Sequence, residues 1–335
     1  MDDEFLEYEE PAANQDKRAE LGLGALVCLV VFVLLAMLAF ILKEAWPAFS
    51  HNGLHFFGTG GNADQQLQAI FTAGDNNRRS NLLVRAWPII WSTILTTTIS
   101  VVLSFVCSLF VAVFMVEFAP GWLQRVLEPV IRLLASVPSV IYGLIGVLVV
   151  VPFIGNHLIT QSEKASVTPV ISLGGYSLLA GVVILTVMIS PIMIAIFAEG
   201  LRSVPRNWLE GSLALGVNRW RTFWKIAVVS ARPALVAGTV LATARALGES
   251  VMLVMVAGTV AYAANPFDGL IFLFEPTRGV AATILQYKDE ITSPPMKETL
   301  FAFAGVLLIT AVSLSLAGWA AKQPQKRHFN VGGLV

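Results

Sequence analysis

Charged residues and cysteines are scarce in this sequence. Charged residues make up 13% of the 335 residues, against 56% hydrophobic residues, and the mean hydropathy is +0.73. This balance excludes the two or three soluble domains that the length would otherwise allow. The formal net charge is zero, so the bulk charge predicts no nucleic-acid partner.

The sequence also lacks the residue patterns of an ATPase or a metal site. No Gly-Lys dipeptide occurs, so the G-x4-G-K-[ST] phosphate-binding loop is absent, and any ATP-driven step needs a separate subunit. The two cysteines, Cys28 and Cys107, lie inside apolar segments and are expected to be inert packing residues rather than a disulfide. The closely spaced histidines, His51 and His55, fall in a loop. We therefore predict no catalytic residue, no metal site and no cofactor in this chain.

Long hydrophobic runs, in contrast, recur along the chain. A transmembrane helix needs about 20 consecutive, mainly apolar residues, and the sequence predicts six such spans. They cover residues 21–42, 88–116, 133–154, 173–198, 234–257 and 299–320. The expected fold class is all-α and integral to the lipid bilayer. One transmembrane domain, residues 21–321, is expected between an acidic tail at 1–20 and a basic tail at 322–335.

Six spans place both termini on the same side of the membrane. The positive-inside rule assigns that side to the cytosol, because the segments that would then lie inside hold 13 Lys and Arg residues and the outer loops hold 8. The outer loops would be residues 43–86, 155–172 and 258–297. Residues 121–132, on the inner side, have the pattern of an interfacial amphipathic helix.

The longest polar and cation-rich stretch between two spans is residues 199–233. Its pattern predicts a helix, a break and a second helix. Ser203 is a candidate N-cap, residues 206–215 have helical apolar spacing, and Gly216 can end the helix because it tolerates positive φ. Asn218 is placed to cap the second helix. Two short helices hinged at a glycine make a rigid knob, which we expect to dock into another protein.

Two charged residues, Arg245 and Glu249, lie inside the fifth predicted span. An arginine at mid-membrane costs roughly 2.5–3.5 kcal/mol and a carboxylate is similarly unfavourable, so neither is expected to face lipid. Four residues apart on one helix, they would share a face and form an ion pair. In a substrate role, Arg245 would bind an oxyanion through two hydrogen bonds while Glu249 balances or gates it. The alternative is a purely structural ion pair, and the sequence leaves both open.

The third span contains Ser136, Pro138, Ser139 and Tyr142 within one short stretch. A proline frees a backbone carbonyl group and bends a helix, and hydroxyl groups around it can line a polar path. The alternative is a kinked packing helix whose serine hydroxyls bond to its own carbonyl groups. Ser136, Ser139 and Tyr142 are therefore candidate residues of a substrate path, together with Arg245.

The cation-rich loop also resembles a known motif. Glu210-Gly211-Ser212, then Gly216 and Ile226, stand at the spacing of the E-A-A-x3-G-x9-I-x-L-P loop of bacterial ABC-importer permeases. A glycine and a serine replace the two alanines, and two valines replace the Leu-Pro pair. In that family the loop docks into the ATP-hydrolysing subunit. The resemblance implies that the residues which couple the chain to this subunit are Glu210, Gly211, Ser212, Ala214, Leu215 and Gly216.

Two further stretches narrow the resemblance. S-V-P-S-V-I-Y-G-L-I-G in the third span and A-R-A-L-G-E-S in the fifth resemble the permease subunits of the bacterial phosphate ABC importer, over about residues 88–320. They look closer to the PstC-type subunit than to the homologous PstA-type subunit, although the Ser-Val-Met run after the glutamate departs from the usual Thr-Met-Ala. The resemblance implies the architecture of a type I ABC-importer permease and a role of Arg245 and Glu249 in phosphate passage.

The resemblance also implies partners and a location. They are a second homologous permease subunit, two ATP-binding-cassette ATPase subunits and an extracytoplasmic phosphate-binding protein, in the bacterial cytoplasmic (inner) membrane. Two other hypotheses remain open. A permease for sulfate or molybdate is one, since a single arginine cannot distinguish tetrahedral oxyanions. A secondary transporter without an ATPase is the other, and the cation-rich loop argues against it, because a stand-alone carrier does not need such a loop.

Overall fold

The computed structural model describes residues 10–73, 84–161, 164, 173–261, 263–267 and 269–329, and of residues 10–18 and 321–329 it describes the backbone alone. Residues 1–9 of the acidic tail predicted at 1–20, the side chains of residues 10–18 and all side chains of the basic tail predicted at 322–335 therefore lie outside the described residues. Parts of the predicted outer loops at 43–86 and 155–172 lie outside them as well.

Within the described residues every regular element is a helix, which confirms the predicted all-α fold class. The α-helices are α1 (Glu10–Asn52), α2 (Ala63–Ala73), α3 (Trp87–Val113), α4 (Gly121–Ser136), α5 (Ser139–Ile145), α6 (Val151–Phe153), α8 (Leu178–Arg202), α9 (Arg206–Ala214), α10 (Arg219–Thr222), α11 (Val228–Ser230), α12 (Arg232–Leu247), α13 (Val251–Val256), α14 (Val280–Gln286) and α15 (Pro294–Phe329). Short π-helical turns extend several of them: η3 (Phe114–Phe118), η4 (Gly146–Val150), η5 (Ile154–Leu158) and η6 (Phe223–Ala227).

Five helical runs of the described chain are long and apolar enough to cross a membrane. They are Ala19–Phe57, Trp87–Phe118, Ser139–Leu158, Leu178–Arg202 and Pro294–Ala320. A sixth crossing is obtained if Arg219–Ser230 and α12, which meet at an angle of 66°, count as one bent span. Pro233 lies in the first turn of α12, where its missing N–H has no helical partner to lose. The bend therefore falls where a proline can start a new helix.

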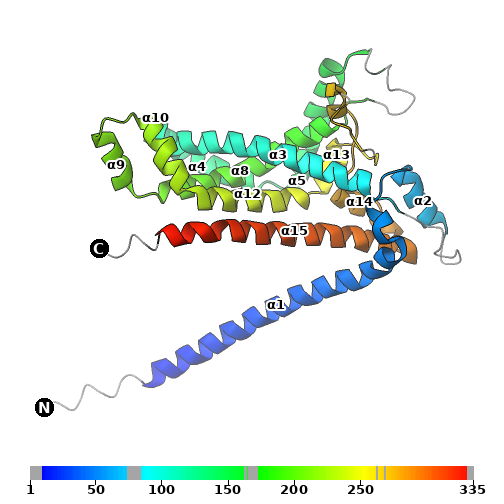
Figure 1. Ribbon diagram of the computed structural model, residues 1–335, viewed down its shortest axis with the longest axis horizontal. Helices are drawn as coiled ribbons and strands as arrows, with labels where there is room; N and C mark the ends of the chain where they lie inside the picture. Colours follow the sequence, from blue (N-terminus) through cyan, green and yellow to red (C-terminus); the bar gives the residue numbers. More distant parts are fainter. Residues whose placement is uncertain are drawn as a thin grey trace.

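The helices run between two ends of the molecule (Figure 1). Helices α3, α8 and α12 pack together, α15 lies along α12, and α1 leaves α15 at an angle. Helices α9 and α10 lie at one end, with the start of α1 and the end of α15, whereas α2 and α14 lie at the other. The side chains of α1 between Leu21 and Leu42 are mostly apolar and exposed. This surface suits contact with lipid or with another transmembrane helix.

Serine hydroxyl groups join α3 to α8 inside the bundle. The Oγ atoms of Ser104 and Ser190 lie 3.0 Å apart. Ser100 Oγ donates to the carbonyl oxygen of Val182 at 3.2 Å, and Ser108 Oγ donates to that of Ser190 at 3.2 Å. The three serines of α3 are fully buried. Small hydroxyl residues let two membrane helices approach closely and bond to each other. Helices α3 and α8 therefore form a closely packed, hydrogen-bonded centre of the bundle.

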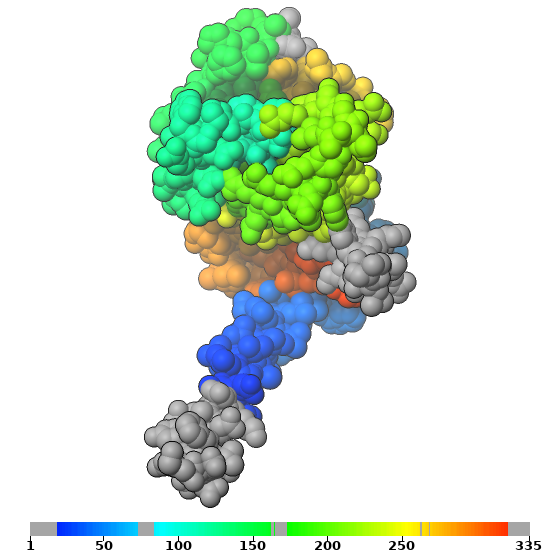
Figure 2. Space-filling model, turned by 90° about the vertical axis from the view of Figure 1, so that its left-hand side faces the viewer, coloured from blue at the N-terminus to red at the C-terminus, as the bar shows by residue number. Residues whose placement is uncertain are grey.

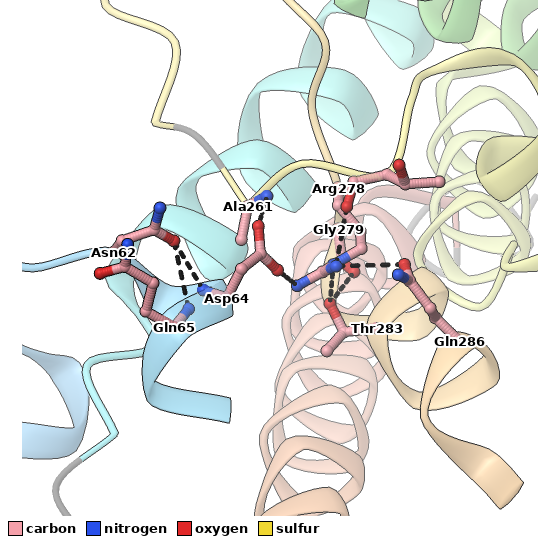
Figure 3. A network of polar contacts seen from close by, with 9 residues as sticks. Asn62, Asp64, Gln65, Ala261, Arg278, Gly279, Thr283 and Gln286 are labelled. Atoms are coloured by element: carbon pink, nitrogen blue, oxygen red, sulfur yellow. Dashed lines mark hydrogen bonds and ion pairs between the residues drawn. The ribbon is translucent and has the colours of Figure 1, made fainter. Parts of the chain in front are cut away.

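A polar network holds together the end opposite α9. We call this end the cap, and it consists of α2, α14 and the described residues among 257–279. Arg278 is 1% exposed and forms an ion pair with Asp64 of α2. Its Nη1 also donates to Gln286 Oε1 at 3.1 Å (Figure 3). The same atom donates to the carbonyl oxygen of Thr259 at 2.8 Å. One guanidinium group therefore connects all three parts of the cap.

The neighbours of this arginine add to the network. The second carboxylate oxygen of Asp64 accepts the N–H of Ala261 at 2.9 Å, and the Nε of Arg278 donates to Thr283 Oγ1 at 3.1 Å. The Tyr287 ring lies 5.3 Å from the guanidinium carbon. Burial raises the pKa of Tyr287, and the Arg278 charge opposes that rise. The charge of Arg278 is thus fully compensated by a carboxylate, oxygen acceptors and an aromatic face, as a buried arginine requires.

Candidate functional site

Helix α9 projects from its end of the bundle and has no buried residue. Trp208 is 45% exposed, Leu213 is 38% exposed, and Leu215, directly after the helix, is 85% exposed. Leu209 packs in part against the main hydrophobic core. Figure 2 looks onto this end, with the α9–α10 segment in yellow-green beside the α4 region in teal. A projecting helix with several large exposed apolar side chains is a candidate surface for another protein.

The turn after α9 has the geometry that the sequence predicts. Gly216 has a φ of 79°, and its N–H donates to the carbonyl oxygen of Leu213 at 2.9 Å. This left-handed conformation favours glycine, because a Cβ atom would be strained there. Asn218 Oδ1 accepts the N–H of Arg221 at 2.8 Å. Both predictions, the glycine stop and the asparagine N-cap, are confirmed.

The prediction that Ser203 caps α9 is wrong. Its Oγ donates to the carbonyl oxygen of Gly200 at 2.8 Å, so the hydroxyl serves the end of α8 instead. The last carbonyl groups of a helix lack partners within the helix, and a nearby hydroxyl satisfies one of them. Ser212 has a role that the sequence did not reveal. Its Oγ lies 2.8 Å from Thr222 Oγ1, which ties α9 to α10.

A groove of about 520 Å³ lies between α9 and the end of the α3 span. Glu210 lines it together with Glu117 and Arg219. Arg219 Nη2 is 2.8 Å from Glu117 Oε1, and that pair bridges the groove. Within the described part of the chain Glu210 is exposed and has no ion-pair partner. Its carboxylate is therefore accessible to another protein.

Arg245 and Glu249 do not lie on one helix, so the predicted shared face and ion pair are wrong. Helix α12 ends at Leu247, and residues 248–250 separate it from α13. Glu249 is 9% exposed, and its Oε1 accepts the N–H of Met252 at 3.1 Å. Arg245 is exposed, and no ion pair between the two is present in the described chain. The carboxylate instead accepts a hydrogen bond from a backbone N–H at the start of α13, where N–H groups have no partner within the helix. The helix dipole also favours a negative charge at this end.

Pro138 interrupts the third span rather than bending a continuous helix. Helix α4 ends at Ser136, and Val137 and Pro138 are extended, with ψ of 130° and 140°, before α5 begins at Ser139. Proline lacks an N–H for the helical bond and disfavours a helical conformation at the residue before it. The interfacial helix predicted at 121–132 and the start of the predicted third span are therefore one helix, α4.

The hydroxyl groups around this break lie in different surroundings. Tyr142 is buried, and its Oη donates to the carbonyl oxygen of Leu134 across the break at 2.9 Å. Ser136 is exposed and donates to a carbonyl group of its own helix at 2.8 Å, as in the structural alternative. Ser139 is half-buried at the start of α5. Of these three hydroxyl residues, Tyr142 is the buried one.

The two broken spans meet at a glycine. A Cβ atom at Gly143 of α5 would lie 2.7 Å from Met255 Sδ and 3.3 Å from Met252 Cα, both in α13. The absence of a side chain at this position therefore allows α5 and α13 to pack in direct contact. Since α13 begins beside Glu249, the break at Pro138 and the break after α12 lie in one region of the bundle.

Sequence reasoning missed the acidic residues that anchor the α9 region. Glu117 and Glu128 stand on either side of the turn before α4. They pair with Arg219 and Arg202, which stand on either side of α9. The paired residues are 102 and 74 positions apart, so no local spacing rule connects them. The only available signal was that two segments assigned to the same side of the membrane carry opposite charges.

Tyr142→Phe is expected to lower stability by about 1 kcal/mol, because it removes one hydrogen bond across the break and leaves the packing of the ring intact. A small decrease in Tm in detergent, against an unchanged Tm for Tyr176→Phe at a 43% exposed position, checks this prediction. Equal Tm values for Tyr142→Phe and the wild type would show that the break does not depend on this bond.

A bundle of transmembrane helices with a projecting helix–glycine–helix loop defines a membrane permease subunit of the ABC-importer class. A family model described as "Binding-protein-dependent transport system inner membrane component" matches residues 105–326, well over half of the chain. The chain therefore belongs to this family. The matched region includes α9 and every candidate path residue.

Curated relatives agree with the resemblance seen in the sequence. The probable ABC transporter permease protein YqgH of Bacillus subtilis is 41% identical over 196 residues, 58% of this chain and 57% of the relative. The probable phosphate transport system permease protein PstC of Methanocaldococcus jannaschii is 30% identical over 207 residues, 60% of this chain and 64% of the relative. Both matches span less than two thirds of the relatives' lengths. PstC 1 of Mycobacterium tuberculosis is 29% identical over 314 residues, 91% of each chain. The similarity to PstC proteins confirms the predicted resemblance.

Solved structures support the fold. The bacterial alginate ABC transporter in complex with an alginate-bound periplasmic protein contains a chain with a TM-score of 0.52 at 13% identity, and the match covers 92% of this chain and 96% of that one. The inward-facing MetNI methionine ABC transporter contains a chain with a TM-score of 0.50 at 19% identity, covering 70% and 94%. At these identities the likeness establishes the architecture of an ABC-importer permease.

Proposed function

We propose that this chain is the PstC-type permease subunit of an importer that moves inorganic phosphate across the bacterial cytoplasmic membrane. ATP hydrolysis in a separate subunit drives the transport. The names of the PstC relatives from Methanocaldococcus jannaschii and Mycobacterium tuberculosis support the choice of substrate. Both termini lie in the cytosol, on the side of α9, in agreement with the positive-inside rule.

The single observation that carries the coupling role is the exposure of α9. This helix has no buried residue, yet Trp208 and Leu213 are large and apolar. Glu210 adds an exposed carboxylate on the same helix, and Gly216 fixes its end. Such a knob fits a cleft in an ATPase subunit, and the coupling residues of the motif, from Glu210 to Gly216, lie on it.

The exposure of Arg245 supports the substrate path. At about 1.5 Å per residue, Arg245 lies about 20 Å along α12 from Arg232, which is well inside a bilayer whose apolar core is about 30 Å thick. A guanidinium group cannot face lipid at that depth without a large cost. Its exposed surface therefore faces a second permease subunit or the water-filled path between two subunits. Tyr142 is a second path residue, because it precedes Gly143, where α5 packs against α13. Glu249 lies in the break between α12 and α13.

The complete importer then contains partners that cover the exposed surfaces. A second, homologous permease subunit closes the path around Arg245. Two ATP-binding-cassette ATPase subunits bind the α9 helices of the two permeases. An extracytoplasmic phosphate-binding protein delivers phosphate at the cap end. Affinity for phosphate resides mainly in that binding protein, because among the residues that the structure describes this chain offers the substrate one exposed intramembrane cation, Arg245.

Glu210→Lys and Gly216→Pro are expected to uncouple ATP hydrolysis from uptake while the complex still assembles. The first reverses the charge of the exposed carboxylate. The second imposes a φ near −65° where 79° is required and removes the N–H that bonds to Leu213. Parallel measurements of phosphate uptake and ATP hydrolysis in membrane vesicles, with assembly checked by co-purification, test this prediction.

Arg221→Gln is the matched control for these two variants. Arg221 is an exposed residue of the same loop, and its side chain makes no ion pair within the described chain. Its replacement should leave uptake per ATP unchanged. Normal coupling in both Glu210→Lys and Gly216→Pro would remove the coupling role from α9.

A further inference from the structure

Two ion pairs bracket α9, and both reach the same segment of the chain. Arg202, at the end of α8, pairs with Glu128 of α4. Arg219, at the start of α10, pairs with Glu117 in η3, with Nε and Nη2 at 3.1 and 2.8 Å from the same carboxylate oxygen. Residues 203–218, which contain α9, are therefore fastened at both ends to residues 117–128.

Hydrogen bonds hold the segment on each side of this attachment in place. On one side, the Ser212–Thr222 hydroxyl bond holds α9 against α10. On the other side, Gln124 Nε2 donates to the carbonyl oxygens of Met115 and Ala119, at 2.8 and 3.2 Å, which fixes the turn between η3 and α4. Two short helical units, each held by its own hydrogen bonds, are thus joined by the Arg219–Glu117 and Arg202–Glu128 ion pairs.

Aromatic rings connect the same two units beside the Arg219–Glu117 pair. The rings of Phe118 and Trp220 have centroids 5.9 Å apart, and those of Phe110 and Trp224 are 5.7 Å apart. Ring pairs at these distances attract each other beyond their buried area. At the η3 end, the attachment is therefore stabilised by the Arg219–Glu117 ion pair and by packing of aromatic rings. At the α4 end, it is stabilised by the Arg202–Glu128 ion pair and by an apolar contact between Ile131 and Ile194.

Helix α4 leads directly from this attachment to the candidate substrate path. It runs from Gly121 to Ser136, with Glu128 near its middle, and stops at the Pro138 break. The Tyr142–Leu134 hydrogen bond spans that break, and the neighbouring Gly143 packs against Met252 of α13, just beyond the break that follows α12. A displacement of α4 along its axis would therefore shift Tyr142 and α5 relative to α13 and the end of α12.

We propose that the Arg202–Glu128 and Arg219–Glu117 pairs make α9 and α4 move as one body, so that α4 carries the motion of the coupling helix to the Pro138 break and to the contact between α5 and α13 beyond the end of α12. The four charged residues are positioning residues and make no contact with substrate. This mechanism rests on the proposed function, since it needs an ATPase subunit that displaces α9. It adds a mechanical route inside the chain, from the loop that binds the ATPase to the path that admits the substrate.

Charge reversal and charge exchange test the ion pairs. Arg202→Glu and Glu128→Arg are each expected to lower uptake per ATP hydrolysed by about fivefold, the effect of losing a partly exposed pair worth up to about 1 kcal/mol. The double variant Arg202→Glu/Glu128→Arg restores the pair with exchanged charges and should return the ratio to near the wild-type value. Arg221→Glu, an equal charge change without a pair to lose, is the control. A double variant no better than its single variants would contradict the proposal.

Distances between spin labels test the motion itself and do not depend on which substrate is carried. Labels at Asn207 of α9 and Gly121 of α4, in the native complex with Cys28 and Cys107 replaced by serine, should keep one distance with and without ATP–vanadate. Asn207 is exposed, and a Cβ atom at Gly121 meets no other atom within 4 Å. The distance from Asn207 to a label at Leu241, a 54% exposed position of α12, should change.

Two results would overturn the proposal. One is a change in the Asn207–Gly121 distance as large as that between Asn207 and Leu241. The other is an Asn207–Gly121 distance distribution that is equally narrow in Arg202→Glu/Arg219→Glu and in the wild type. A wild-type complex that hydrolyses ATP without taking up phosphate would disprove the proposed substrate, and the label distances would still decide whether α9 and α4 move together.

Discussion

Replacing Arg278 by methionine is expected to destabilise the cap by about 3–5 kcal/mol, the usual cost of removing one partner from a buried ion pair. Arg278 is 1% exposed, while the Asp64 side chain is 21% exposed. Methionine would leave the Asp64 charge without its cation, and it would leave Gln286 and the carbonyl group of Thr259 without their donor. Thermal unfolding of the purified protein in detergent, with protease cleavage of α2 as a local probe, measures the effect.

Lys288→Met is the matched control for that experiment. Lys288 pairs with Asp289 at 2.8 Å in the same end of the molecule, but the two side chains are 57% and 85% exposed. A solvent-exposed pair between neighbouring residues contributes little, so this variant should unfold at the wild-type temperature. If Arg278→Met and Lys288→Met unfold at the same temperature, the buried network does not hold the cap together.

Arg245→Gln is expected to reduce phosphate uptake at least about tenfold, because a hydrogen bond to a charged group contributes about 1.5–3 kcal/mol. Glutamine keeps a polar side chain, although a shorter one, but has neither the positive charge nor the planar pair of donors that binds an oxyanion. Arg245 is exposed and forms no ion pair with Glu249 in the described chain, so the substitution does not remove a cation from the Glu249 carboxylate. Assembly and stability should therefore be close to those of the wild type.

Arg245→Lys distinguishes charge from geometry at this position. Lysine keeps the positive charge but presents a point charge instead of a fork of donors, so uptake should fall between the values for Arg245→Gln and the wild type. Uptake that is normal in an assembled Arg245→Gln complex would place this residue off the path and make its role structural.

The parts of the site that depend on nearby residues were predictable from the sequence. The glycine at 216 and the cap at Asn218 involve bonds to residues three positions away, and the structure confirms both. The succession of apolar runs predicted an all-α membrane fold because this signal is also local. A helix that crosses a bilayer needs about 20 consecutive, mainly apolar residues, and such a run is visible in the sequence itself. Local rules worked where local contacts decide the conformation.

The predictions that failed depended on contacts between distant segments. The sequence of the fifth span is apolar enough to continue as a helix, yet the chain breaks after Leu247 and Glu249 bonds to the start of α13. Ser203 satisfies the end of one helix instead of the start of the next. Arg278 was assigned to an outer loop as an ordinary cation, and its partner Asp64 lies 214 positions away in sequence. No spacing rule connects residues so far apart.

The measurement that tests the central proposal most directly is the uptake of radiolabelled phosphate by bacterial cells. The cells come from a strain that lacks the gene for this chain and to which the wild-type chain has been supplied. The account predicts ATP-dependent phosphate uptake that excess sulfate does not reduce and that is lost without the chain. No phosphate uptake by an assembled wild-type complex would contradict the proposed substrate. Uptake of phosphate that sulfate suppresses would indicate a permease for oxyanions in general.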